Sequence, residues 1–371
     1  MKIAHVKSLY DRIGGIESLL GNLMPEMLDQ PDVEPLVILI ADRRHPEIES
    51  RLSAGGRVQI EIIPWQGLKA APLAARRLRR IVRDNNVDVL HTHDMRANLL
   101  TALQKPFGRT PWLCHMHGWL GDTHRGKHKL YEAIDRRLIR FADHVLVGSH
   151  AALDEVQAAG ARRASVAWNA VKLPDLDPSD RVALGLPENA VIATVLGRLH
   201  FGKGQDMFLD ALSALASQSD WHGVLVGVGD PETEAALKAR ADALGLSQRV
   251  TFTGFVPETG PWIAASDIVV VPSRKESLPL TCLEGMAAAR PVIVSDTGDL
   301  PRVVKDGATG IVIGVDDTAA LTSALARLIG DTDLRAKMGQ AARQTVEANH
   351  TAGVLAAECV SAAKDVLNLR A

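Results

Sequence analysis

Two domains of doubly wound α/β architecture are predicted for this chain, each built on a parallel β-sheet. The length of 371 residues exceeds what one ordinary hydrophobic core supports. Short runs rich in Val and Ile alternate with segments of helical periodicity, which is typical of parallel sheets covered by helices. This alternation stops in a Pro- and Asp-rich stretch near 169–189 and then starts again. The predicted boundaries are therefore 1–170 and 171–345, followed by a C-terminal helix within 346–371 that we expect to return to the first domain.

Strands are predicted where apolar runs end at turn residues, and helices where apolar residues recur at spacings of three and four. In the first domain the predicted strands are 2–6, 34–42, 58–65, 87–93, 111–118 and 144–149, with helices at 72–85 and 128–142. In the second they are 191–199, 222–230, 249–256, 267–273, 290–298 and 309–314, with helices at 206–218 and 232–245. The terminal helix is predicted over 352–369.

Composition and cysteine spacing exclude several classes of protein. With 46% hydrophobic and 23% charged residues, the chain resembles a globular protein rather than a disordered one. Cys114, Cys282 and Cys359 stand far apart, without the paired spacing of a disulfide framework or a zinc site. The N-terminus lacks the pattern of a secretory signal, and no apolar run approaches the length of a membrane span. We therefore expect a cytoplasmic protein.

The formal net charge of −2 conceals an asymmetry between the two domains. Residues 1–172 contain 25 Lys and Arg against 19 Asp and Glu, whereas residues 173–371 contain 17 against 25. In the positive part, segment 75–83 has arginines opposite an apolar face. An ordinary surface helix explains this segment; the alternative is a patch that holds the protein peripherally on anionic lipid at the inner face of a membrane. No nucleic-acid partner is expected, because no recognised binding motif accompanies the charge.

The first segment with a chemical signature is GRLHFGKG, residues 197–204, between a predicted strand and a predicted helix. It contains Arg198 and Lys203. A glycine-bearing loop with a guanidinium and an ammonium at a helix start is suited to bind an anion. A solvated basic turn is the alternative, but the position at the carboxyl end of a strand favours a diphosphate site.

The second such segment, RKESLPLTCLEGMAAARPVIVSD, places Glu276 before a predicted helix and Glu284 within it. Ser277 is the expected cap of this helix, and free N–H groups at its start, such as that of Leu280, can bind phosphate oxygens. Flanking carboxylates would repel an anion unless they accept hydrogen bonds from neutral hydroxyls. A nucleotide sugar fits such a site, because its diphosphate lies between the hydroxyls of the sugar and the diol of the ribose. In the alternative, Glu276 caps the helix and Glu284 forms a surface salt bridge.

These motifs resemble those of the GT-B, retaining family 4 glycosyltransferases, also called glycosyl transferases group 1. The resemblance is carried by the Glu-x7-Glu pattern of Glu276 and Glu284 after a Pro-Ser strand end, and by the loop at 197–204. Further similar segments are RIGGIE at 12–17, HMHG at 115–118, VGSHAALDEV at 147–156, GVG at 227–229 and TGFV at 253–256. The resemblance implies a GT-B fold, with two Rossmann-like domains facing each other across a cleft and the acceptor bound by 1–170.

The resemblance also implies a role for each matching residue. Arg198 and Lys203 would hold the donor diphosphate, Glu284 the ribose, and Glu276 would orient the transferred sugar. His117 would lie near the reacting carbon and completes the expected catalytic set of His117, Glu276, Arg198 and Lys203. Further substrate-binding positions are Gly14 and Gly15 near donor and acceptor, Phe255 and Val256 near the nucleobase, and Leu278 and Leu280 at the helix start.

The implied activity is transfer of a hexose from a nucleotide diphosphate sugar to a hydroxyl of a glycan or lipid-linked acceptor, with retained anomeric configuration. Bacterial envelope, exopolysaccharide or lipopolysaccharide synthesis is the expected setting. A sugar-nucleotide epimerase of the same fold and a scaffold that only binds sugar nucleotides are the alternatives.

No metal ion is expected as a cofactor, because cationic side chains and helix amides would neutralise the leaving group. His91 and His93 have a spacing compatible with metal binding, but no third ligand is indicated. A loop at a strand end that borders the acceptor cleft is expected there instead. Asp175 and Asp177 lie in the predicted linker, where a turn is expected rather than a metal site.

Overall fold

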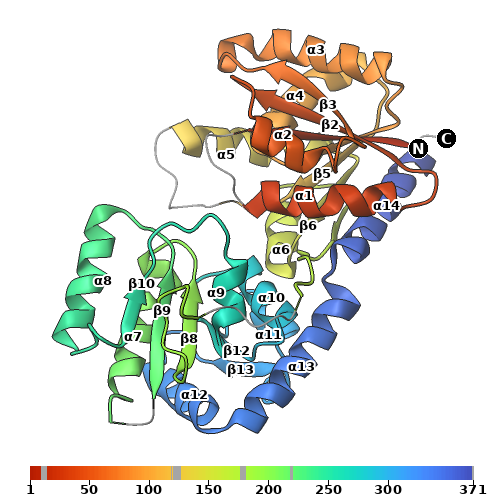
Figure 1. Ribbon diagram of the computed structural model, residues 1–371. Helices are drawn as coiled ribbons and strands as arrows, with labels where there is room; N and C mark the ends of the chain where they lie inside the picture. Colours follow the sequence, from red (N-terminus) through yellow and green to blue (C-terminus); the bar gives the residue numbers. More distant parts are fainter. Residues whose placement is uncertain (10–14, 118, 120–126, 176–180, 218–219, 370–371) are drawn as a thin grey trace. The chain divides into compact units, whose positions relative to one another are not determined.

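The computed structural model describes residues 1–9, 15–117, 119, 127–175, 181–217 and 220–369. The chain divides into two compact units. Unit 1 comprises Met1–Ala170 and Ala352–Ala371, and unit 2 comprises Val171–Thr351. The predicted fold class is confirmed, because each unit contains a parallel sheet covered by helices (Figure 1). The C-terminal helix extends from Ala352 to Asn368, close to the predicted 352–369, and the residues of segment 346–371 up to Asn349 belong to the preceding helix.

Unit 1 is built on a parallel sheet with the strand order β3-β2-β1-β4-β5-β6-β7. Its strands are β1 (Lys2–Ser8), β2 (Glu34–Ala41), β3 (Gln59–Pro64), β4 (Val89–Thr92), β5 (Trp112–Met116), β6 (His144–Val147) and β7 (Ala164–Val166). Its α-helices are α1 (Gly15–Leu28), α2 (Pro46–Leu52), α3 (Ala71–Asp84), α4 (Met95–Gln104), α5 (Lys127–Leu138), α6 (His150–Ala158) and α14 (Ala352–Asn368). The strand order reverses between β1 and β4, the point at which open α/β sheets commonly bind ligands.

Alternate residues along the strands of unit 1 pack on opposite faces of the sheet. Ile3, Val89 and Leu113 face α1 and α14, which pack against each other (Figure 1). Ala4 and Leu90 face the opposite way, toward α3 and α4. Because successive strand residues point to opposite faces, β1, β2 and β4 contribute to both of these clusters. The C-terminal helix α14 is therefore part of the hydrophobic core of unit 1.

Unit 2 is built on a second parallel sheet with the strand order β10-β9-β8-β11-β12-β13. Its strands are β8 (Val191–Leu196), β9 (Trp221–Val226), β10 (Val250–Phe252), β11 (Ile268–Val271), β12 (Val292–Ser295) and β13 (Gly310–Ile313). Its α-helices are α7 (Gln205–Ser213), α8 (Pro231–Ala243), α9 (Gly260–Ala265), α10 (Leu280–Ala287), α11 (Leu300–Val303), α12 (Thr318–Gly330) and α13 (Thr332–Asn349). The strand order reverses between β8 and β11.

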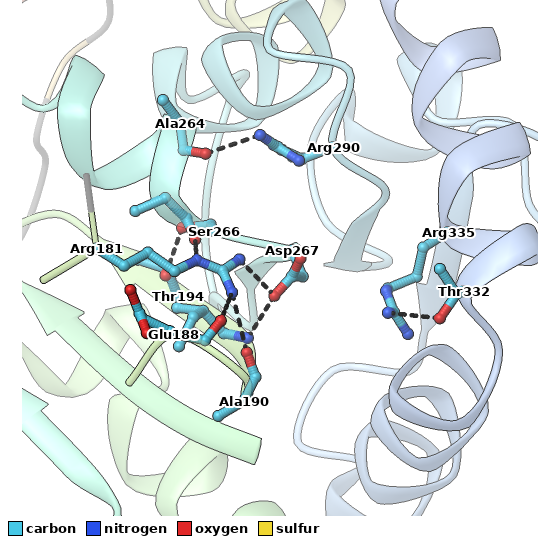
Figure 2. A network of polar contacts seen from close by, with 12 residues as sticks. Arg181, Glu188, Ala190, Thr194, Ala264, Ser266, Asp267, Arg290, Thr332 and Arg335 are labelled. Carbon is cyan, nitrogen blue, oxygen red and sulfur yellow. Dashed lines mark hydrogen bonds and ion pairs between the residues drawn. The ribbon is translucent and has the colours of Figure 1, made fainter. Parts of the chain in front are cut away.

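A polar network holds the amino ends of β8 and β11 together (Figure 2). The carboxylate of Asp267 accepts hydrogen bonds from the backbone N–H of Ile192, at 2.7 Å, and from the guanidinium of Arg181, at 2.8 Å. Arg181 also donates to the carbonyl oxygens of Glu188, Ala190 and Ala265. The network joins the segment before β8 to the sheet at the edge opposite the ligand-binding end, so we assign it to stability.

Candidate functional site

The loops that follow β8 and β11 meet at the carboxyl edge of the unit 2 sheet. Gly204 closes the first loop with φ +71°, and a Cβ atom there would lie 2.0 Å from the carbonyl oxygen of Pro272. On the other side, a Cβ atom at Gly298, with φ +58°, would lie 2.2 Å from the carbonyl oxygen of Glu276. Only glycine combines this backbone conformation with so close an approach. Both glycines therefore fix the position of the loop that carries Glu276.

Arg274 clamps these two loops to each other. Its guanidinium donates to both carboxylate oxygens of Asp206, at 2.9 and 3.0 Å, and stacks 3.8 Å from the ring centroid of Phe201. Its backbone N–H donates to the carbonyl oxygen of Gly202 at 2.9 Å. Burial acts to raise the pKa of Asp206, but the hydrogen bonds and charge of Arg274 outweigh it and leave that pKa below its ordinary value. Sequence reasoning missed this clamp, since its two charged members lie 68 residues apart.

The structure brings together two of the predicted site residues, Lys203 and Glu276, as an ion pair. Oε1 of Glu276 accepts from the Lys203 ammonium and also from the hydroxyl of Ser273, at 3.1 Å. The side chain of Glu276 is 13% exposed, and that of Lys203 is 34% exposed. The alternative in which Glu276 caps α10 is wrong, because that helix has no side-chain cap.

Glu284 lies on α10 and is partly buried, and its carboxylate forms no hydrogen bond or ion pair with any other described residue. Burial raises the pKa of its carboxyl group. The alternative of a surface salt bridge at Glu284 is therefore wrong. Ser277 is not the cap of α10 as expected, because Pro279 occupies the N-cap position and the carbonyl oxygen of Ser277 accepts from the N–H of Asp299 instead. The N–H of Leu280, in the first turn of α10, has no acceptor among the described residues.

The remaining predicted residues of unit 2 take no part in this ion pair. Arg198 is exposed in the loop after β8, and its guanidinium forms no hydrogen bond or ion pair with a described side chain, whereas its carbonyl oxygen accepts from Gln205 at 3.0 Å. Phe255, with 70% of its surface exposed, and Val256 follow the edge strand β10. Leu278 is 3% exposed, so its side chain belongs to the core of the loop rather than to a ligand surface.

In unit 1, His117 follows β5 and ends a row of stacked imidazole rings. Its ring centroid lies 4.4 Å from that of His115 and 5.8 Å from that of His93, and its Nε2 is 3.5 Å from Nδ1 of His93. Burial, followed by the field of His115, holds the pKa of His117 well below its ordinary value, so the ring is neutral at pH 7. Gly15 opens α1, whereas Gly14 and Asp177 lie outside the described residues.

The expectation of a loop at His91 and His93 is wrong for His91, which lies within β4 and is fully buried. His93 follows β4 and is 1% exposed. Together with His5, His115 and His117 these residues form a histidine stack, which sequence reasoning missed. Within each strand the alternation was visible in the sequence, because His91 and His93, and likewise His115 and His117, are two residues apart and so lie on one face. That these faces coincide depends on the register, which pairs His5 with His91 and His91 with Leu113.

Beside the stack lies a buried ion cluster that sequence reasoning also missed. The ammonium of Lys7, with 2% of its side chain exposed, is 3.0 Å from a carboxylate oxygen of Glu17 and 3.5 Å from one of Asp94. Asp94 in turn accepts from the N–H groups of Arg96 and Ala97 and thereby caps α4. The cluster joins the ends of β1 and β4 to the first turns of α1 and α4.

Two family models match the chain, one in each half. Residues 14–170 match the model described as glycosyl transferase 4-like domain, and residues 177–345 match glycosyl transferases group 1. The chain belongs to the group 1 glycosyltransferases. The family resemblance drawn from the sequence motifs is thereby confirmed.

Relatives of this glycosyltransferase include two enzymes that are named as mannosyltransferases. The lipopolysaccharide core biosynthesis mannosyltransferase LpcC of Rhizobium leguminosarum bv. viciae is 36% identical over 180 residues, which are 47% of this chain and 51% of LpcC. A phosphatidyl-myo-inositol mannosyltransferase of Mycobacterium leprae is 28% identical over 352 residues, which are 91% of this chain and 89% of the relative. The chain spans about half the length of LpcC and of the related LpsB of Rhizobium meliloti.

Solved structures share the fold of this glycosyltransferase. Anabaena Alr3699/HepE, solved in complex with UDP, superposes with a TM-score of 0.82 at 20% identity and covers 98% of this chain and 100% of its own. A glycosyltransferase from Rickettsia africae superposes with a TM-score of 0.81, also at 20% identity, over 99% and 98% of the two chains. The expected GT-B fold is thereby confirmed. Within the described residues, none of the helices combines the length and apolar character needed to cross a membrane.

Proposed function

We propose that this glycosyltransferase moves a hexose from a nucleotide diphosphate sugar to a hydroxyl of a glycan or lipid-linked acceptor, with retained anomeric configuration. One observation carries the proposal: Lys203 and Glu276 are paired at the carboxyl edge of the unit 2 sheet, at the point where the strand order reverses. An ammonium and a carboxylate there can separate and bind a phosphate and a sugar hydroxyl respectively.

The donor would be held by side chains of unit 2 with distinct tasks. Arg198 and Lys203 would bind the diphosphate. The N–H of Leu280, which has no acceptor among the described residues, would add a backbone contact to the same group two residues after Leu278. Glu276 would accept hydrogen bonds from the transferred sugar, and Glu284 from the ribose diol. Glu284 suits this role because its carboxylate has no partner among the described residues. Phe255 and Val256 would border the nucleobase.

Catalysis would depend on stabilising the leaving diphosphate as the bond to the sugar lengthens. A guanidinium and an ammonium held near the developing charge lower the barrier without reorganising during the reaction. The clamp of Arg274 on Asp206 supports such preorganisation, since it fixes both loops from which these cations project. The acceptor hydroxyl would attack from the face that the diphosphate leaves, and the departing phosphate could take its proton.

His117 of unit 1 is the residue that we assign to the transferred sugar near the reacting carbon. Its ring is neutral, because burial and the neighbouring His115 oppose protonation. A neutral imidazole can exchange hydrogen bonds with a sugar hydroxyl without placing a second positive charge beside an oxocarbenium-like carbon. Gly14 and Gly15 would let the backbone at the start of α1 approach donor and acceptor.

The biological setting that we propose is assembly of a bacterial envelope polysaccharide or lipopolysaccharide. The support is that the LpcC and LpsB relatives are named as mannosyltransferases of lipopolysaccharide core biosynthesis. A lipid-linked acceptor would require contact with a membrane surface. In α3 of unit 1, the arginines at 76, 77, 79, 80 and 83 are exposed, as are Leu73 and Phe107 nearby. Such a mixed basic and apolar surface is suited to anionic headgroups at the inner face of a membrane.

A donor screen followed by product analysis tests this function. Stabilisation against heat would be measured with UDP-, GDP- and ADP-sugars, and the donor identified in this way would be incubated with and without acceptor glycans. The expected product is a glycoside with the anomeric configuration of the donor. Excess EDTA should not slow its formation, because side-chain cations rather than a metal ion would stabilise the leaving diphosphate. Conversion of the donor without acceptor would identify an epimerase instead, and binding without conversion would identify an inactive scaffold.

A further inference from the structure

The histidine stack of unit 1 contains polar atoms that the rest of the described chain leaves without partners. Neither ring nitrogen of His91 or of His115 has a hydrogen-bond partner in the part of the chain that the structure describes, and both side chains are buried, at 0% and 1% exposure. A buried polar group without a partner costs about 1–3 kcal/mol. Four such atoms in one place point to a ligand that binds imidazole nitrogen.

The third member of the site comes from the C-terminal helix. His91 on β4 and His115 on β5 share the face of the sheet that α14 covers, and Cys359 of α14 is fully buried there. One ligand atom from each of these three residues lies within 4.8 Å of the other two. Ligand atoms around one ion with bonds of 2.0–2.3 Å are roughly 3.5 Å apart, so a small rotation of the side chains would close the site.

We propose that His91, His115 and Cys359 form a binding site for a monovalent copper ion in the core of unit 1. Thiolate and imidazole are ligands that Cu⁺ prefers. On binding, the Sγ–H bond of Cys359 is exchanged for a bond from the thiolate to copper, and the proton leaves to solvent. One thiolate and Cu⁺ form a neutral complex, which suits a site with apolar neighbours such as Leu355 and Val360.

The charge of the complex distinguishes this ion and this set of ligands from their competitors. Zn²⁺ with the same three ligands would leave one net positive charge in the core, and burying an uncompensated charge is strongly unfavourable. Two further groups, His5 with His91 and His93, and His93 with His115 and His117, are also close enough to share an ion. They contain imidazole alone, so any metal ion bound there would keep its full charge.

The experiment is an anaerobic titration of the metal-free full chain with Cu⁺, competed against a chromophoric cuprous chelator, with X-ray absorption to identify the ligands. The expected result is one Cu⁺ per chain with one sulfur and two nitrogen ligands. Cys359→Ala should lower the affinity by about 100-fold or more. Cys114→Ala is the matched control, because Cys114 is equally buried in unit 1 but lies in a different core cluster. Circular dichroism and thermal unfolding would show that both variants are folded.

A second pair of variants keeps the test independent of the cysteine. His115→Gln should reduce the two copper–nitrogen bonds to one and lower the affinity for Cu⁺, whereas His144→Gln, at a histidine outside the stack, should leave both unchanged. Three outcomes would overturn the proposal: Cu⁺ bound by Cys359→Ala as tightly as by the unaltered chain, a bound ion without a sulfur ligand, or Zn²⁺ taken up in preference to Cu⁺ by these residues.

Discussion

Arg198 is the exposed cation of the proposed donor site, and its guanidinium forms no hydrogen bond or ion pair with a described side chain. We expect Arg198→Ala to lower kcat about 10²–10³-fold with little change in KM for the donor, because the guanidinium would act mainly on the charge that develops in the transition state. Steady-state kinetics with the donor found in the screen measure this. Lys275→Ala, which removes an exposed charge from the neighbouring loop, is the control. Equal kinetics for Arg198→Ala and the control would contradict the assignment.

Glu284 has the opposite expected profile. Because it would bind the ribose diol equally in the ground state and the transition state, Glu284→Ala should raise KM for the donor by about 10-fold or more and leave kcat nearly unchanged. Calorimetric titration with the free nucleoside diphosphate should show the same loss of affinity. A drop in kcat with unchanged KM would assign Glu284 to the reacting centre instead.

Asp135 provides a prediction about pH. Burial raises the pKa of this carboxyl group to about 6, although Asn98 and Trp119 both donate hydrogen bonds to it. Its folded-state pKa therefore exceeds the unfolded value, and the free energy of unfolding should fall as pH rises from about 4 to 6. The difference in the free energy of unfolding between Asp135→Asn and the unaltered chain should therefore shift in favour of the variant by up to about 3 kcal/mol from pH 4 to pH 7. Urea denaturation across this range measures the difference.

The control for Asp135 is Asp154→Asn, at an exposed acid on α6. This surface substitution should change the free energy of unfolding by less than about 0.5 kcal/mol. A stability difference between Asp135→Asn and the unaltered chain that does not vary with pH would contradict the raised pKa of Asp135.

At the scale of secondary-structure elements, the network around Arg181 and Asp267 should decide how firmly β8 and β11 are held (Figure 2). Arg181→Ala removes the donor to three carbonyl oxygens and leaves a partly buried carboxylate with one hydrogen bond fewer. We expect a loss of about 2–4 kcal/mol in the free energy of unfolding of unit 2. Arg327→Ala, at an exposed position of α12, should change it by less than about 0.5 kcal/mol. A similar small effect at Arg181 would contradict the structural role.

The elements themselves could be predicted because their periodicity is local. Strands such as β8 and β11 are short apolar runs, and helices such as α3 repeat their apolar residues every three or four positions. That Lys203 and Glu276 belong to one site could be predicted, because both follow neighbouring parallel strands, but their ion pair was not predicted. The clamp between Arg274 and Asp206 was not, since it depends on how two loops fold back on each other. The histidine stack depends on the register between β1, β4 and β5, which no local pattern specifies.

At the scale of the whole molecule, α14 should stabilise unit 1 and not unit 2. Leu355 is 1% exposed in the core that α14 shares with α1. We expect Leu355→Ala to cost about 2–5 kcal/mol and to speed amide hydrogen exchange in β1, β4 and β5. The same substitution at Leu325 of α12, in the core of unit 2, should speed exchange in β8–β13 instead. Faster exchange in the unit 2 strands of Leu355→Ala would contradict this division.

The return of the chain to unit 1 after Thr351 has a consequence for biosynthesis. Residues 171–351 form one uninterrupted stretch, so unit 2 can fold as soon as it has left the ribosome. The first 170 residues emerge earlier, but their hydrophobic core is completed only when Leu355, Cys359 and Val366 have been synthesised. During translation the nascent N-terminal half therefore exposes the apolar residues that α14 later covers.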